Sequence, residues 1–182
     1  MKFTKVAVLL AVFALAALPM FGQATATATT PISVLRTESI SLSVTTPLPQ
    51  LVIPAGTMSA PAQDVVVQSA WNLKQSRTNG VQICAYVSSA LIGTPASGNG
   101  DTIPINNIYI TPSGGSATAL GGGTPACGIA GAVQYTNYAT TTAAERKNFT
   151  GQSDTIPVSV TLSTDVAADT YTGTLNLIAY SN

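Results

Sequence analysis

Short stretches in which apolar and polar residues alternate dominate the pattern of the chain. Between residues 154 and 162 every second side chain from Ile156 onward is aliphatic, and a similar alternation returns between residues 171 and 179. A period of two is typical of strands that bury one face. Because only residues 163–169 separate the two stretches, we expect them to form an antiparallel hairpin.

The same alternation appears three times in the first half of the chain. Residues 39–44 predict one strand, residues 64–73 a second and residues 81–87 a third. The second strand places Trp71, the only tryptophan, on its apolar face, where a sandwich core would use it as an anchor. Asn79-Gly80 is a tight-turn signal. Trp71 and Cys84 are therefore expected on neighbouring strands of one hairpin.

Turn signals separate all of these stretches. Prolines 47 and 49 interrupt the chain before a short expected strand at residues 51–53, and residues 140–147 have helical propensity over one or two turns. No long helical period occurs, so the sequence predicts an all-β protein, an antiparallel immunoglobulin-like β-sandwich of seven to nine strands.

Tyr171 follows the turn at residues 167–169 and is a second candidate core anchor. Its hydroxyl could bond to backbone in the preceding turn, as corner tyrosines do in such sandwiches. An ordinary core or surface tyrosine is the alternative interpretation.

The first residues have the pattern of a cleaved secretory signal. Lys2 and Lys5 precede an apolar run of about 13 residues, and the small residues Ala24-Thr25-Ala26 follow it. We expect a signal peptide at residues 1–26, with cleavage after Ala24 or Ala28 as alternatives, and a single β-sandwich domain at residues 27–182. The expected location is secreted, either periplasmic or at the cell surface, with no membrane span.

Charge and cysteine content narrow the function classes. Beyond residue 26 there are five basic and seven acidic residues, so no basic surface for nucleic acid is expected. An oxidising compartment favours a disulfide between Cys84 and Cys127, with a free thiol or a metal ligand as alternatives. A bridge closing a loop of about 43 residues is worth about 4 kcal/mol in the chain-entropy model.

The chain contains no histidine, which removes the usual general base near neutral pH and the commonest metal ligand. We therefore expect no enzyme, no cofactor and no metal site. Asp165 and Asp169 flank one turn, where they are interpreted as turn formers, with weak calcium binding as the alternative. Tyr86 and Tyr180 fall on the less apolar faces of their strands and are the candidate ligand platform, with partial burial as the alternative.

The segment Asp169-Thr-Tyr-Thr-Gly-Thr-Leu-Asn-Leu-Ile-Ala-Tyr180 resembles the end of spore coat protein U-type and related fimbrial domains. The resemblance covers about 25 residues. It implies an immunoglobulin-like sandwich in a secreted subunit of surface fibres or coats, assembled with chaperone and usher help.

Two functional hypotheses follow. The first is a secreted, non-catalytic structural or adhesive surface protein, a fibre or coat subunit that assembles by β-strand addition with itself or with other fimbrial or coat subunits. The alternating residues 32–44 would be donated to a neighbour's groove; pairing of this strand within its own domain is the alternative. The second hypothesis is a self-contained secreted carbohydrate-binding β-sandwich whose partner is a surface glycan.

Overall fold

The computed structural model describes residues 32–94, 100–122 and 124–181. Its internal contacts divide the chain into the units Met1–Leu35 and Arg36–Asn182. The signal peptide expected at residues 1–26 lies outside the described residues. In the first unit, residues 32–35 belong to no strand, and Ile32, Val34 and Leu35 expose 86–88% of their surface.

Strands make up about half of the second unit. The described residues hold β1 (Ser39–Thr46), β2 (Ser59–Asn72), β3 (Val81–Val87), β4 (Leu91–Gly93), β5 (Thr102–Ile103), β6 (Ile108–Ile110), β7 (Thr118–Ala119), β8 (Val133–Tyr138), β9 (Lys147–Thr161), β10 (Tyr171–Thr172) and β11 (Leu175–Tyr180), with one short 3-10 helix, η2 (Ile105–Asn107). Every pairing between these strands is antiparallel, so the prediction of an all-β antiparallel fold is confirmed. Several of the eleven strands have only two or three residues, and the number exceeds the seven to nine expected. Within the described ranges, no helix has the length and apolar character needed to cross a membrane.

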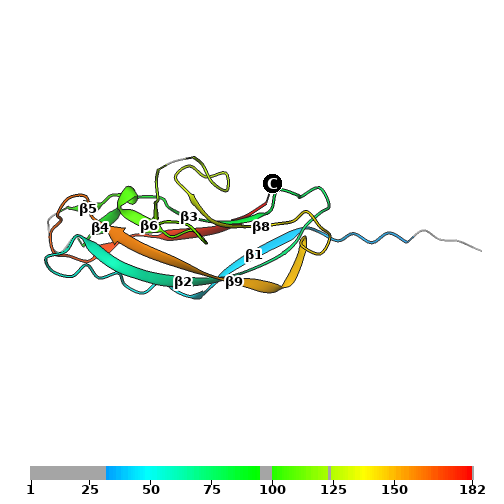
Figure 1. Ribbon diagram of the computed structural model, residues 1–182, viewed down its shortest axis with the longest axis horizontal. Helices are drawn as coiled ribbons and strands as arrows, with labels where there is room; N and C mark the ends of the chain where they lie inside the picture. Colours follow the sequence, from blue (N-terminus) through cyan, green and yellow to red (C-terminus); the bar gives the residue numbers. More distant parts are fainter. Residues whose placement is uncertain (1–31, 95–99, 123, 182) are drawn as a thin grey trace, which may run out of the picture. The chain divides into compact units, whose positions relative to one another are not determined.

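The strands form two layers around one core. The first layer has the order β1-β2-β9-β6-β7, and the second has the order β11-β3-β8. A small sheet, β10-β4-β5, extends the second layer, because β4 follows β3 and β10 precedes β11 along the chain. Figure 1 shows β2 and β9 running together beneath β3 and β8.

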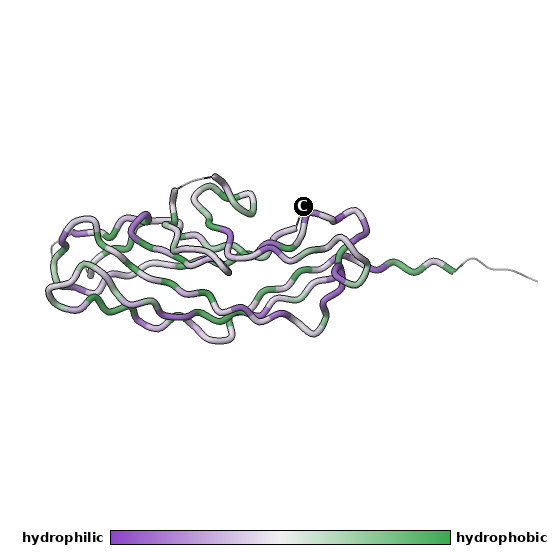
Figure 2. Tube along the Cα trace, in the orientation of Figure 1, coloured by the Kyte–Doolittle hydropathy of each residue, from purple (hydrophilic) through white to green (hydrophobic). Residues whose placement is uncertain are grey.

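Alternation along the strands builds the core between the layers. Val65 and Val67 of β2 are buried, as are Ile156 and Val158 of β9, and they pack with Ile83 of β3. Figure 2 shows hydrophobic and hydrophilic residues succeeding one another along the tube. The period of two therefore placed the buried faces of β2, β3 and β9 correctly, whereas Val44, which has the parity of Ile40 and Leu42 in β1, is 52% exposed.

Two expected hairpins are wrong. The strand β9 pairs with β2 and β6, whereas β10 and β11 pair with β4 and β3 in the other layer. The strands β2 and β3, which carry Trp71 and Cys84, likewise lie in different layers. Alternation shows only that a strand has one buried face. Two strands in opposite layers of a sandwich have the same alternation as two strands that pair, so the pattern does not tell which strands pair.

Two local expectations are also wrong. Residues 51–53 form no strand, because they lie between Pro49 and Pro54, which have no backbone N–H to donate. The expected helix at residues 140–147 is absent: residues 143–146 form a turn, with a bond from the Arg146 N–H to the Thr142 carbonyl at 3.2 Å, and Lys147 begins β9. So short a segment gains too few hydrogen bonds to offset helix nucleation.

Candidate functional site

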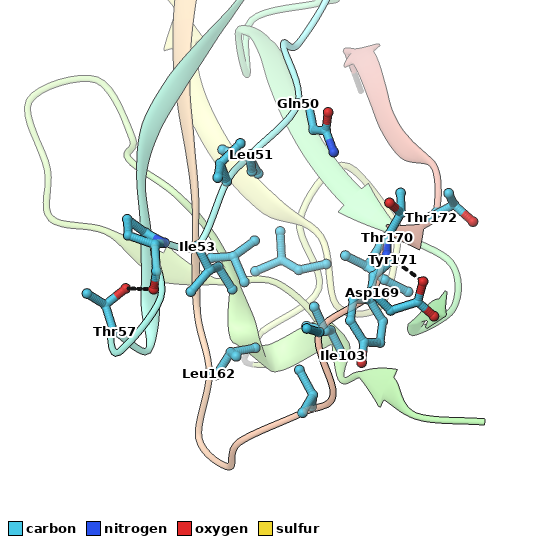
Figure 3. A pocket seen from close by; sticks show the side chains of 18 of the residues that line it. Gln50, Leu51, Ile53, Thr57, Ile103, Leu162, Asp169, Thr170, Tyr171 and Thr172 are labelled. Carbon is cyan, nitrogen blue, oxygen red and sulfur yellow. Dashed lines mark hydrogen bonds between the residues drawn. The ribbon is translucent and has the colours of Figure 1, made fainter. Parts of the chain in front are cut away.

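A cavity of about 710 Å³ lies between the two layers at one end of the sandwich. Its deep wall consists of core side chains from both layers, namely Val87, Leu91, Ile103, Ile108, Val158, Val160, Leu162 and Leu175. Figure 3 shows Ile53, Ile103 and Leu162 around the same space. The core of this end is therefore incompletely filled by the strands alone.

The mouth of the cavity lies between two segments. Residues 48–57, the connection from β1 to β2, form one side, and residues 165–173, which lead into and past β10, form the other. Figure 3 shows Leu51 and Ile53 on the first side and Tyr171 and Thr172 on the second. Both sides present a mixture of apolar groups and hydroxyls.

The strand β11, which has one unpaired edge among the described strands, begins at this cavity. The strand β11 pairs with β3 along one edge, and no described strand pairs with its other edge. Leu175, its first residue, also lines the cavity. The backbone N–H and C=O groups of an unpaired edge can accept another strand. The structure thus combines a ladder edge that no described strand pairs with, although β1 of the other layer lies close to β11, and an apolar cavity at the start of the same strand.

Tyr171 holds one side of the cavity in place. Its hydroxyl donates to the Ala167 carbonyl at 2.8 Å, four residues earlier, and its ring packs against the core. This is the backbone bond expected of a corner tyrosine. The ring is half-buried and lines the cavity as well.

Acidic residues near the cavity shape the turn before Tyr171. Asp169 accepts hydrogen bonds from the Thr94 hydroxyl and from the Thr170 N–H, and Asp101 accepts one from the Ala167 N–H at 3.0 Å. Asp165 also lines the cavity. No cluster of three or more potential metal-ligating residues occurs among the described residues. The hydrogen bonds of Asp101 and Asp169 therefore show that these two residues stabilise the turn.

Cys84 and Cys127 form a disulfide, with their Cα atoms 6.3 Å apart. Both are buried, together with Ala132, in a small cluster separate from the main core. Cys84 lies opposite Ile178 of β11, so the bridge attaches residues near Cys127 to the face of the second layer that points away from the core.

Tyr86 and Tyr180 pack against this disulfide cluster and are half-buried. Tyr86 lies opposite Asn176, and Tyr180 lies opposite Gln82. Four residues along a strand therefore separate their positions, which corresponds to about 13 Å. The structure places the two tyrosines at opposite ends of the cluster instead of side by side.

Trp71 belongs to a buried polar cluster that sequence reasoning missed. Its indole N–H donates to the Glu145 carbonyl at 2.8 Å, and its ring stacks on Tyr138 with the centroids 5.3 Å apart. The Tyr138 hydroxyl donates to Oδ1 of Asp154, a residue that is only 8% exposed. Burial is the largest cause that raises the pKa of Tyr138 above its ordinary value, and the neighbouring Asp154 is the second.

The period of β9 contained the signal for this cluster. Asp154 has the same parity as Ile156 and Val158, so its carboxylate had to point into the core. Its Oδ2 atom is buried and has no hydrogen-bond partner among the described residues, and the same is true of the Ser69 hydroxyl. Because this buried carboxylate has a single side-chain donor, removing that donor should lower the stability of the fold considerably.

Fold and site together define a disulfide-linked, two-layered antiparallel β-sandwich that has one unpaired edge beside an apolar cavity. Comparison with protein-family models, with curated proteins and with solved structures finds no match to this chain.

Proposed function

We propose that this protein is a secreted, non-catalytic structural or adhesive surface subunit that assembles by β-strand addition. The observation that carries the proposal is the unpaired edge of β11, a strand that begins at the cavity. In strand addition, backbone bonds to a sheet edge provide affinity, and pockets for alternate side chains provide register. The edge and the cavity supply these two elements in one place.

The order of the strands supports the same proposal. Immunoglobulin-type sandwiches arrange strands A, B, E and D in one sheet and C, F and G in the other. Here β1-β2-β9-β6 matches A-B-E-D by chain order and position, and β3 with β11 matches C with F. No described strand occupies the position of G, which would pair with the outer edge of β11. The added strand would fill that position.

We infer that the donated segment is shorter than the residues 32–44 expected from the sequence. The strand β1 pairs with β2 inside its own layer, so its residues are already committed. Ile32 and Val34 precede it, alternate with Ser33, and are among the most exposed aliphatic side chains described. We assign the segment around Ile32 and Val34 of a second copy as the donor.

Magnitudes indicate what such an assembly requires. Complete burial of two aliphatic side chains contributes about 3–6 kcal/mol. Association costs at least about 4 kcal/mol in lost translational and rotational freedom. Side-chain burial alone therefore gives weak binding, and the hydrogen bonds to the edge of β11 have to supply the rest.

Sedimentation and electron microscopy of the exported, oxidised protein test the proposal. We expect oligomers or filaments from the full chain, a monomer from Ile32→Ser/Val34→Ser, and normal assembly from the control Ser33→Ala, whose side chain has the opposite parity. Assembly that survives Ile32→Ser/Val34→Ser would exclude this segment as the donor. A strictly monomeric full chain would overturn strand addition altogether.

The carbohydrate-binding alternative has less support. A sugar platform needs exposed aromatic rings close together, whereas Tyr86 and Tyr180 are half-buried and their positions lie four residues apart along the strands. Binding of a surface glycan therefore stays a prediction that no observation of the structure favours.

A further inference from the structure

Residues 48–53 form one side of the cavity in an unusual way. The segment runs between β1 and β2 without belonging to a strand. Leu51 and Ile53 pack partly buried against the core, while Val52 between them is 63% exposed. Residues 51–53 thus have the side-chain alternation of a strand, whereas Leu48, which has the opposite parity to Leu51 and Ile53, also packs partly buried against the core.

Its backbone, in contrast, is not held by a ladder. Among the described residues, no backbone hydrogen bond joins residues 48–53 to either layer. Pro47, Pro49 and Pro54 lack the N–H groups that a ladder would need. The nearby bonds close only the turn after the segment, where the N–H and the hydroxyl of Thr57 both donate to the Pro54 carbonyl.

A segment that is held by side chains alone is attached less firmly than a strand that is also held by backbone hydrogen bonds. Regions with partly buried apolar groups and solvent-exposed backbone open at a lower free energy than the paired strands around them. An incoming strand that has a backbone donor at every residue from Ile32 onward would gain the ladder bonds that the prolines deny to this segment. Competition for the same apolar space therefore favours the incoming strand.

We propose that residues 48–53 are a displaceable cover: they shield the cavity in the unassembled chain and leave it when a strand of a second copy adds to the edge of β11. This inference rests on the proposed function, because it requires an added strand. It goes further by assigning the prolines a role, which is to keep the cover from pairing permanently with the edge of its own chain. The device shields apolar surface before assembly without blocking assembly.

The test measures how fast a donor strand binds. The acceptor is the full chain carrying Ile32→Ser/Val34→Ser, and the probe is a fluorescent peptide with the sequence of residues 27–36, followed by stopped-flow anisotropy. Leu51→Ser/Ile53→Ser in the acceptor removes the side chains that hold the cover, and we expect association about tenfold faster or more. The matched control Val52→Ser changes an exposed side chain of the same segment and should leave the rate unchanged.

A second variant moves the rate in the opposite direction. Pro47→Thr/Pro49→Val restores two backbone donors, so the cover can pair with its own edge, and association should become several-fold slower. Because this change removes no apolar contact, it remains informative even if Leu51→Ser/Ile53→Ser folds poorly. Hydrogen exchange within residues 48–53 should also accelerate when the peptide binds.

The outcomes separate the two proposals. Peptide binding at equal rates in all variants, or binding that leaves exchange in residues 48–53 unchanged, would overturn the cover and leave strand addition standing. Absence of binding in every variant, including the one with the loosened cover, would overturn both.

Discussion

The hydroxyl of Tyr138 is predicted to stabilise the fold far more than an average hydroxyl. It is the only described side-chain donor to Asp154, whose second oxygen is buried without a partner. Tyr138→Phe keeps the ring that stacks on Trp71 and removes only the donor. A buried charged group that loses its partner costs its desolvation penalty, about 2–3 kcal/mol. For a domain of this size the melting temperature should fall by about 5–10 °C.

Two matched variants make the interpretation specific. Tyr135→Phe removes a hydroxyl that donates to the neutral carbonyl of Thr155 at 2.8 Å and should cost about 1 kcal/mol. Replacing both members of the buried pair, as in Tyr138→Phe/Asp154→Leu, should recover part of the loss, because no unsatisfied carboxylate remains. Urea unfolding followed by Trp71 fluorescence measures all three. A loss below about 0.5 kcal/mol for Tyr138→Phe, or no recovery in the double variant, would refute the reasoning.

The same pair predicts how stability depends on pH. Burial raises the pKa of Tyr138, and of Tyr135, above that of an unfolded tyrosine. A raised folded-state pKa favours the protonated phenol, so the stabilisation is fully present below the unfolded pKa of about 10. It is lost as pH rises above that value, and Tyr138→Phe should lessen this alkaline loss. A parallel pH profile for the variant between about pH 9 and 12 would contradict this.

Three further changes test other parts of the structure. Tyr171→Phe removes the bond to the Ala167 carbonyl and should cost about 1 kcal/mol in thermal unfolding, with faster hydrogen exchange in residues 165–170; unchanged exchange would show that the hydroxyl does not hold this turn. Cys84→Ala/Cys127→Ala opens a loop with a sequence separation of 43 and should lower stability to urea by up to about 4 kcal/mol, and the variant's stability should not respond to reductant. Gly80→Ala should cost at least about 2 kcal/mol, because φ is +97° and a Cβ would lie 2.8 Å from the Tyr138 carbonyl, whereas Gly56→Ala, with φ +78° and open space, should cost about 1 kcal/mol; equal losses would refute the steric argument.

The sequence predicted the parts of the fold that depend on local pattern. Alternation identified the buried faces of β2 and β3, and the two cysteines formed the expected bridge. The tight turn expected at Asn79-Gly80 is wrong: Gly80 has a positive φ, but the hydrogen-bonded turn lies at residues 74–77 and β2 does not pair with β3. Which strands pair was not predictable in the same way. Strands that face each other across a core and strands that share a ladder have identical periods, so the β2–β3 and β9–β11 neighbours were wrongly expected to be hairpins.

The candidate site shows the same division. Tyr171 could be predicted because its position after a turn is a local feature. The cavity, the free edge of β11 and the pair of Tyr138 with Asp154 arise from residues far apart in sequence, and only the packed layers bring them together. Residues 51–53 read as a strand because they alternate, yet neighbouring prolines leave them outside every ladder. That mismatch between pattern and pairing is the basis of the displaceable cover.

Hydrogen exchange along β11 in the assembled and the monomeric protein tests the central claim most directly. In the Ile32→Ser/Val34→Ser monomer, amides that face the free edge should exchange rapidly, while those bonded to β3 are protected. Assembly by strand addition predicts that every second amide of Leu175–Tyr180 becomes newly protected. Assembled protein in which these amides still exchange as they do in the monomer would contradict strand addition at this edge.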